Sequence, residues 1–180
     1  MADVRRKSQQ DSWKYLFKLG AFVTPKNHAG FDPTTYTFQF NPELERLAFV
    51  RTTVEERNFA HSTLDALKIS RSTVQNVNFS RSALKSASFC WNNFHDCDFG
   101  HTLLNHADLR GSIYHQCSFK HAILDGADLR MSIYEMCSFL GTSMKGTRLT
   151  FEIGDTLNLD SRQRDEIEWM DSDGPIPEGG

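Results

Sequence analysis

Cysteine and histidine are the residues of this 180-residue chain whose types and spacing could support chemistry. Three cysteines and two pairs of histidines each recur at an interval of 20 residues: Cys97, Cys117 and Cys137, then His95 and His115, then His101 and His121. Thiolates and imidazoles bind transition metals, and imidazole also titrates close to neutral pH. Such residues come together only if the chain itself repeats at the same interval.

The apolar residues show that the chain does repeat. Every fifth residue from Leu44 to Leu149 is large and apolar, which makes 22 positions in succession. A period of five fits neither a helix, at about 3.6 residues per turn, nor a strand, at 2. A smaller side chain usually lies two residues before each large one. This pattern predicts a corner every five residues, and four such sides close a square coil.

The square coil is visible as self-similarity, and its units match a known consensus. Residues 107–126 align without gaps on residues 127–146. Ala107-Asp-Leu-Arg-Gly111 and Ala127-Asp-Leu-Arg-Met131 match the A-(D/N)-L-x-x consensus of the pentapeptide repeat family, which the chain resembles over residues 44–150. The resemblance implies an all-β solenoid, a right-handed quadrilateral β-helix. At a β-spacing of about 4.8 Å, the predicted ~5.5 coils form a rod of roughly 26 Å.

Three segments follow from this pattern, with caps at both ends. Residues 1–43 form a basic segment with a predicted helix over 11–20 and a capping strand over 35–40. Residues 44–150 form the β-helix. Residues 151–180 contain a predicted α-helix over about 161–170, which begins at a capping box from Asp160 to Gln163, and an acidic tail over 171–180 that is predicted to be disordered.

Charge and hydropathy limit the partners of the chain. The net charge is −3, and the repeat itself is nearly neutral, with twelve Lys and Arg against eleven Asp and Glu. No apolar run approaches the roughly 20 residues of a membrane helix, and the first ten residues lack a signal-peptide core. We therefore expect a cytoplasmic protein that binds neither membranes nor nucleic acid directly, with its cysteines reduced.

The polar residues have structural interpretations within this repeat. The three spaced cysteines are expected to fill inward positions, and Cys90 to point outward as a free thiol. The histidine columns are expected to be solvated surface ladders. Two further pairs, Asp108 and Arg110 with Asp128 and Arg130, are expected to form a charged surface ladder. No catalytic or cofactor-binding motif is present, so we expect no enzymatic activity and no cofactor.

The strongest functional signal is a group of apolar residues at positions expected to face outward. Exposed contiguous apolar area usually marks an interface. The candidate interface residues are Trp91, Leu103, Ile113, Ile123, Met131, Ile133 and Met136, with Ile167 and Trp169 from the C-terminal helix. Either the C-terminal segment folds back over this patch, or a partner covers it. In a third arrangement the C-terminal helix of a second copy covers it and forms a homodimer.

The sequence thus favours a non-enzymatic protein–protein interaction module that binds a partner or itself through flat solenoid walls. Two alternatives stay open. The family resemblance implies that the chain could protect DNA gyrase by mimicking DNA, although a nearly neutral rod argues against this role. The basic start of the chain leaves room for a secreted bacterial effector.

Overall fold

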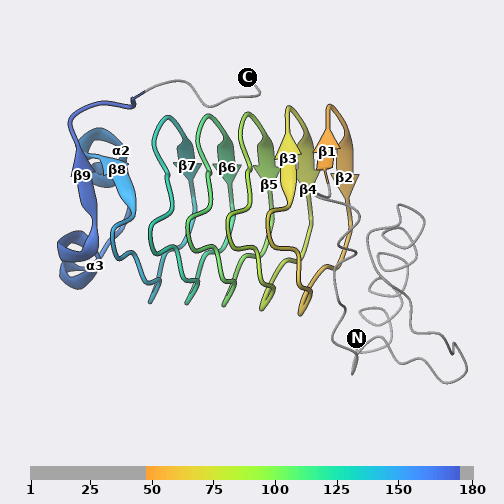
Figure 1. Ribbon diagram of the computed structural model, residues 1–180, viewed down its shortest axis with the longest axis horizontal. Helices are drawn as coiled ribbons and strands as arrows, with labels where there is room; N and C mark the ends of the chain where they lie inside the picture. Colours follow the sequence, from red (N-terminus) through yellow and green to blue (C-terminus); the bar gives the residue numbers. More distant parts are fainter. Residues whose placement is uncertain (1–47, 175–180) are drawn as a thin grey trace, which may run out of the picture.

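The computed structural model describes residues 48–174 of the chain. The helix predicted over 11–20, the strand predicted over 35–40 and the last six residues of the predicted tail lie outside the described residues. Within them the chain winds into a rod of stacked coils, which is closed at one end by two short helices and a strand (Figure 1). The predicted β-solenoid is confirmed.

Every strand pairs in parallel with the strand one coil away. The largest sheet contains β2 (Thr53–Glu55), β4 (Thr73–Gln75), β5 (Asn93–His95), β6 (Ile113–His115) and β7 (Ile133–Glu135). β1 (Ala48–Val50) pairs with β3 (Lys68–Ser70), and β8 (Arg148–Thr150) pairs with β9 (Glu168–Met170). Each residue pairs with the residue 20 positions later, as Val54 does with Val74. The coil therefore has the length that the repeat predicts.

Each coil has four walls, which we call A, B, C and D. Each wall is identified by the buried residue at its centre. Wall A is the five-stranded sheet, and the central residues of walls B, C and D begin with Phe59, Leu64 and Phe49. In each wall the central residue recurs every 20 positions, and isolated parallel bridges pair the coils of walls B and C. Around the coil the order is D, A, B and C, so walls A and C face opposite ways.

Stacked aromatic rings fill the centre of the rod. In wall B the ring centroids of Phe79 and Phe99 lie 5.1 Å apart, and those of Phe99 and Phe119 lie 5.0 Å apart. In wall A, Tyr114 stacks on Tyr134 at 5.0 Å. This spacing follows from the distance between coils, which is close to the optimum for parallel rings. Repeating one residue type down a column therefore packs the interior without gaps.

The corners require a strained backbone at regular intervals. Every fifth residue from Arg51 to Gly146 has a positive φ, which gives twenty corner positions, and sixteen of them are not glycine. A left-handed conformation costs an L-residue roughly 1–2 kcal/mol. The corners hold because their own amides pair with carbonyls of the neighbouring coil. The amide of His101, for example, donates to the carbonyl of Lys120 at 2.9 Å.

The C-terminal cap differs from the predicted helix over 161–170. α2 (Phe151–Thr156) was not predicted, α3 (Ser161–Glu166) ends four residues early, and β9 follows it. The reason is register, because Trp169 lies one coil after Leu149 and pairs with it as the next residue of wall D. Its indole occupies the space where a side chain at Gly154 would lie. The predicted capping box between Asp160 and Gln163 is confirmed.

Residues of the cap supply hydrogen bonds that a further coil would have made with the last one. Gln163 Nε2 donates to the carbonyls of Phe139 at 2.7 Å and Thr142 at 3.1 Å. Glu166 accepts from the amide of Met144 through its carboxylate and from that of Gly146 through its carbonyl. A β-helix that stopped without such partners would expose a row of unpaired backbone groups.

Gln163→Ala is expected to lower the free energy of unfolding by about 2–3 kcal/mol, because it removes two buried hydrogen bonds to the last coil and the capping box. Urea unfolding followed by far-UV circular dichroism measures this change. Asp165→Ala, an exposed position on the same helix, serves as the control and should stay within about 0.5 kcal/mol of the unaltered chain. Equal losses in the two variants would contradict this role for Gln163.

The corners provide a second test at Ser86, an exposed residue with φ of 56°. Ser86→Val places a β-branched residue in the left-handed region and should destabilise the chain, whereas Ser86→Gly relieves the strain. We expect the urea midpoint of Ser86→Val to lie below that of the unaltered chain and the midpoint of Ser86→Gly to lie above it. The free energies of unfolding of the two variants should differ by about 2 kcal/mol. Identical midpoints would show that the corner carries no strain.

Candidate interaction surface

Large apolar side chains are exposed mainly at the C-terminal end of the rod. Among residues 48–174, the exposed large apolar residues are Val50, Ile113, Ile133, Met136, Leu140 and Phe151. Five of these six lie between residues 113 and 151. On wall A, the outward position before the central residue is Thr53, Thr73 and Asn93 in the early coils, and becomes isoleucine only in β6 and β7. The wall therefore changes from polar to apolar along its length.

Ile113, Ile133 and Met136 form the centre of this surface, which we call the wall A patch. Ile113 and Ile133 are register partners on β6 and β7. Ile133 is 52% exposed, and Met136, at the following corner of the same coil, is 76% exposed. Trp91 and Met131 flank the patch at the D–A corner and are half-buried. The structure thus brings five of the predicted residues to wall A and its two corners, in its later coils.

The remaining predicted residues lie elsewhere. Leu103 and Ile123 are register partners on wall C, which faces away from the patch, and both are half-buried. Ile167 is buried in the cap, and Trp169 stacks on Phe151 with a centroid distance of 4.7 Å. The C-terminal segment therefore closes the end of the rod, and Ile133 and Met136 stay exposed beside it.

Leu140 and Phe151 belong to the exposed apolar end but were not predicted. Leu140 directly follows the central residue Phe139, at the position that Cys90 occupies after Phe89. Phe151 begins α2, where the chain leaves the five-residue phase. A search for apolar residues at every non-central position would have found Leu140, but no periodic signal marks Phe151.

Trp91 shows how the D–A corner is built. Its indole lies against Gly111 of the next coil, where a Cβ would approach the ring to 3.0 Å. Gly111 also has a φ of 68°, so glycine meets both the conformational and the spatial demand. The indole Nε1 of Trp91 is buried and has no hydrogen-bond partner among the described residues.

The cysteine column has a structural role beyond filling space. Cys97, Cys117 and Cys137 donate through Sγ to the central carbonyls of Val74, Phe94 and Tyr114, each 23 residues earlier. At other corners the same kind of carbonyl accepts a backbone bond, as Phe79 does from the amide of Ser82 at 3.1 Å. The thiols thus donate to carbonyls at corners where no backbone amide of the same turn does so. The prediction of an inward column is confirmed.

At the D–A corner, serine and asparagine side chains donate hydrogen bonds to carbonyls as the cysteines do. Ser112 and Ser132 donate to the carbonyls of Phe89 and Leu109 at 2.6 and 2.7 Å. The side chain of Asn92 donates to the carbonyl of Ile69 at 2.7 Å. A small donor two residues before the central position thus satisfies a carbonyl at these corners, and these side chains are engaged by the backbone.

Cys90 is a free thiol, as predicted, but the prediction that it points outward into solvent is wrong. Its side chain is buried, with Sγ 3.6 Å from the hydroxyl of Ser88 and 3.9 Å from the carbonyl of Asp108. Adjacent coils lie so close together that Asp108 and Arg110 cover the thiol. Burial and the carboxylate of Asp108 raise the pKa of Cys90 to about 11. A thiol with such a pKa is a weak nucleophile at neutral pH.

The histidines lie beside their counterparts in the next coil, as the repeat predicts. His101 and His121 are exposed, and their ring centroids are 5.0 Å apart. His95 and His115 are half-buried on wall A, with centroids 5.7 Å apart. Within residues 48–174 no group of three His, Cys, Asp or Glu side chains is arranged to hold a metal ion.

The charged ladder of wall D pairs as predicted, but part of it is buried rather than solvated. Arg110 donates to Asp108 at 2.8 Å, and Arg130 donates through Nε and Nη2 to both oxygens of Asp128 at 2.9 and 2.7 Å. Asp128 and Arg130 are buried because Arg110, Arg148 and the C-terminal residues lie around them. Although burial opposes it, hydrogen bonding from Arg110 lowers the pKa of Asp108.

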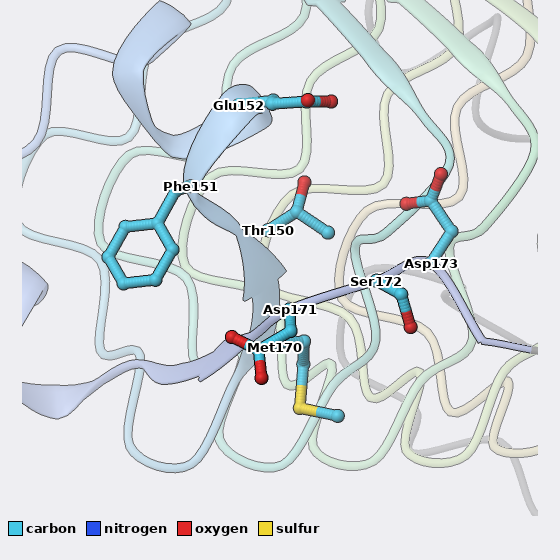
Figure 2. A pocket seen from close by; sticks show the side chains of 7 residues that line it. All are labelled: Thr150, Phe151, Glu152, Met170, Asp171, Ser172 and Asp173. Atoms are coloured by element: carbon cyan, nitrogen blue, oxygen red, sulfur yellow. The ribbon is translucent and has the colours of Figure 1, made fainter.

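A pocket of about 260 Å³ lies between α2 and the residues after β9 (Figure 2). Glu152, Asp171 and Asp173 contribute carboxylates to its lining, together with Thr150, Met170, Ser172 and Phe151. Figure 2 shows the ring of Phe151 pointing away from the other labelled side chains. The lining contains no basic side chain, and we assign the pocket no catalytic role.

Comparisons with known proteins agree with this architecture. The family model described as pentapeptide repeats matches residues 75–111 and 93–130, with eight copies of the repeat. A search of curated proteins found no match. A pentapeptide repeat protein from the thylakoid lumen of Arabidopsis thaliana is 21% identical, with a TM-score of 0.43, over 77% of this chain and 83% of that one.

Two other solved structures are similar at lower scores. Rfr23, a pentapeptide repeat protein from the cyanobacterium Cyanothece 51142, is 21% identical with a TM-score of 0.28, over 56% of this chain and 59% of that one. Full-length QnrB1, a plasmid-mediated fluoroquinolone resistance protein, is 12% identical with a TM-score of 0.24, over 69% and 84%. At these values the structures carry no argument about function.

The repeat motif and the parallel register together identify the class of protein. The chain is an all-β solenoid whose walls are built from five-residue units, and its residues 75–130 match the model of the pentapeptide repeat family. Over residues 48–174, neither helix has the length and apolar character needed to cross a bilayer.

Asp128→Asn is expected to destabilise the chain by about 3 kcal/mol, because it leaves the buried guanidinium of Arg130 without its anion. Asp108→Asn is the matched control. Asp108 is more exposed, and its partner Arg110 also approaches Asp128 at 3.7 Å, so the expected loss is about 1 kcal/mol. Urea unfolding at pH 7 measures both changes. A larger loss for Asp108→Asn would contradict the central place of Asp128.

Proposed function

We propose that this chain is a non-enzymatic protein–protein interaction module that binds through the wall A patch. The observation that carries the proposal is the change of wall A from threonine and asparagine to Ile113 and Ile133 in its last two strands. Both isoleucines are exposed on a flat parallel sheet whose inner face already has its core. Solvent-exposed isoleucine gives the rod no packing, so a surface that binds another molecule explains it better than folding does.

The surroundings of the patch indicate what kind of partner fits. Next to the isoleucines on the same strands lie His115 and Glu135, and Met136 borders the patch at the corner. An apolar centre with a polar rim is the usual arrangement of a protein–protein interface. The partner would present a flat apolar face, and a second copy of this chain is one candidate. In that case contact through wall A, rather than the C-terminal helix, would form the homodimer, because Ile167 is buried within its own chain.

The charges of the walls argue against the gyrase-protecting alternative. A DNA mimic needs carboxylates that stand in for phosphates along the rod. In this chain the stacked aspartates Asp108 and Asp128 are each paired with an arginine of the same coil. Wall D therefore offers no row of free negative charge over these coils. We also propose no catalytic function, since the polar side chains of the corners are engaged by the backbone.

Ile133→Asp is the variant that tests the proposed surface. A charge at the centre of the patch should lower self-association, measured by sedimentation equilibrium, or capture of a partner by at least about tenfold. Because Ile133 is exposed, its replacement should leave the unfolding midpoint nearly unchanged.

Ile123→Asp places the same change on wall C, which faces the other way, and provides the matched control. It should leave association unaltered. The proposal is refuted if Ile133→Asp associates like the unaltered chain, or if only Ile123→Asp loses association.

A further inference from the structure

Residues Asp171–Gly174 cross back from the cap over the last D–A corner, and we call them the strap. Nη1 of Arg130 donates to the carbonyl of Ser172 at 3.4 Å, and the amide of Met131 donates to Oδ1 of Asp173 at 3.2 Å. Gly174 lies so close to the same guanidinium that a Cβ there would be 2.7 Å from Nη1. In Figure 1 the strap is the dark blue stretch that leaves β9.

The bond to Met131 replaces one that the repeat would otherwise make. At other corners the amide donates to a backbone carbonyl of the next coil, as His121 does to Leu140 at 3.0 Å. After Thr150 the chain enters α2 instead of turning a corner. The amide of Met131 therefore uses a side-chain carboxylate, which can leave without unwinding a coil.

The strap bonds to the backbone at one of the two corners that border the wall A patch. Met131 and Met136 lie at the two corners that flank β7, and both have left-handed backbones, with φ of 60° and 53°. Met131, beneath the strap, is half-buried, whereas Met136 is 76% exposed. Two methionines of the same coil thus differ in exposure. The strap bonds to the backbone of Met131 alone, at a corner where Trp91 and Gly111 of earlier coils are half-buried too.

The strap is held weakly. All four of its residues are exposed, and its two hydrogen bonds are 3.2 and 3.4 Å long. Segments with few buried apolar contacts and solvent-exposed hydrogen bonds open at little cost in free energy. The cap itself does not depend on the strap, because β9 pairs with β8 and Gln163 holds α3 against the last coil.

We propose that the strap is a displaceable cover, which closes the Met131 edge of the wall A patch and competes with the partner for it. This inference rests on the proposed function of the patch. A segment that displaces the strap would present a carbonyl or carboxylate to the amide of Met131 and an apolar side chain to Ile133. Asp173 supplies the first of these contacts in the closed state.

Methionine oxidation by dilute hydrogen peroxide, read by mass spectrometry, tests the cover directly. Met136 serves as an internal reference in every sample. In Asp173→Ala the ratio of Met131 to Met136 oxidation should rise several-fold, because the strap loses its acceptor. Asp171→Ala, an exposed strap residue on the other side of Ser172, should leave the ratio unchanged. An unchanged ratio in Asp173→Ala would overturn the strap as a cover.

A second measurement tests the competition, with the fluorescent apolar probe ANS in place of the unidentified partner. Asp173→Ala should bind ANS several-fold more tightly than the unaltered chain, and adding Ile133→Asp should abolish the gain. A higher Met131 ratio without tighter ANS binding would overturn the competition. If Ile133→Asp leaves association of the unaltered chain intact, the proposed function fails, while the Met131 ratio still decides whether the strap is a cover.

Discussion

Parallel pairing between residues one coil apart is the constraint on which the rest of the structure depends. It places each side chain of the β-helix about 4.8 Å from its counterpart in the next coil. A residue type is therefore acceptable only if it stacks well on that counterpart. Phenylalanine meets this condition in wall B, where successive rings from Phe79 to Phe139 lie 5.0 to 5.1 Å apart. The same pairing imposes a left-handed backbone at twenty corners, whatever residue stands there.

This constraint also decides what the chemically interesting side chains do. An inward-pointing carbonyl at each corner needs a donor, and the coil supplies one either from the backbone or from the residue two positions before the next central residue. Cysteine, serine and asparagine fill that position because they are small and can donate. Thiols and hydroxyls that could suggest a metal site or a nucleophile are instead hydrogen-bonded to carbonyls at the corners. Outside the core, the guanidinium of Arg130 is in the same way committed to Asp128.

A solenoid has two ends, and the end at the C-terminus shows how the repeat is stopped. The chain keeps its register long enough for Trp169 to complete wall D, while two short helices replace the walls between. Gln163, Glu166 and Asp173 supply with side chains the hydrogen bonds that another coil would have supplied with its backbone. The same end carries the exposed apolar residues. The place where the repeat stops is thus also the place where its surface departs most from a plain polar wall.

The five-residue period by itself determined the coil, the core columns and the corners, because each residue within the repeat has only one way to face once the period is known. It also placed Ile113, Ile133 and Met136 on the outside. Features that depend on neighbours far along the chain or outside the phase were decided only by the tertiary structure. Cys90 is buried because Asp108 and Arg110 of the next coil lie over it, which no local pattern indicates. The end of α3 at Glu166 follows from the pairing of Trp169 with Leu149, and the hydrogen-bond acceptor for the amide of Met131 is Asp173, 42 residues later.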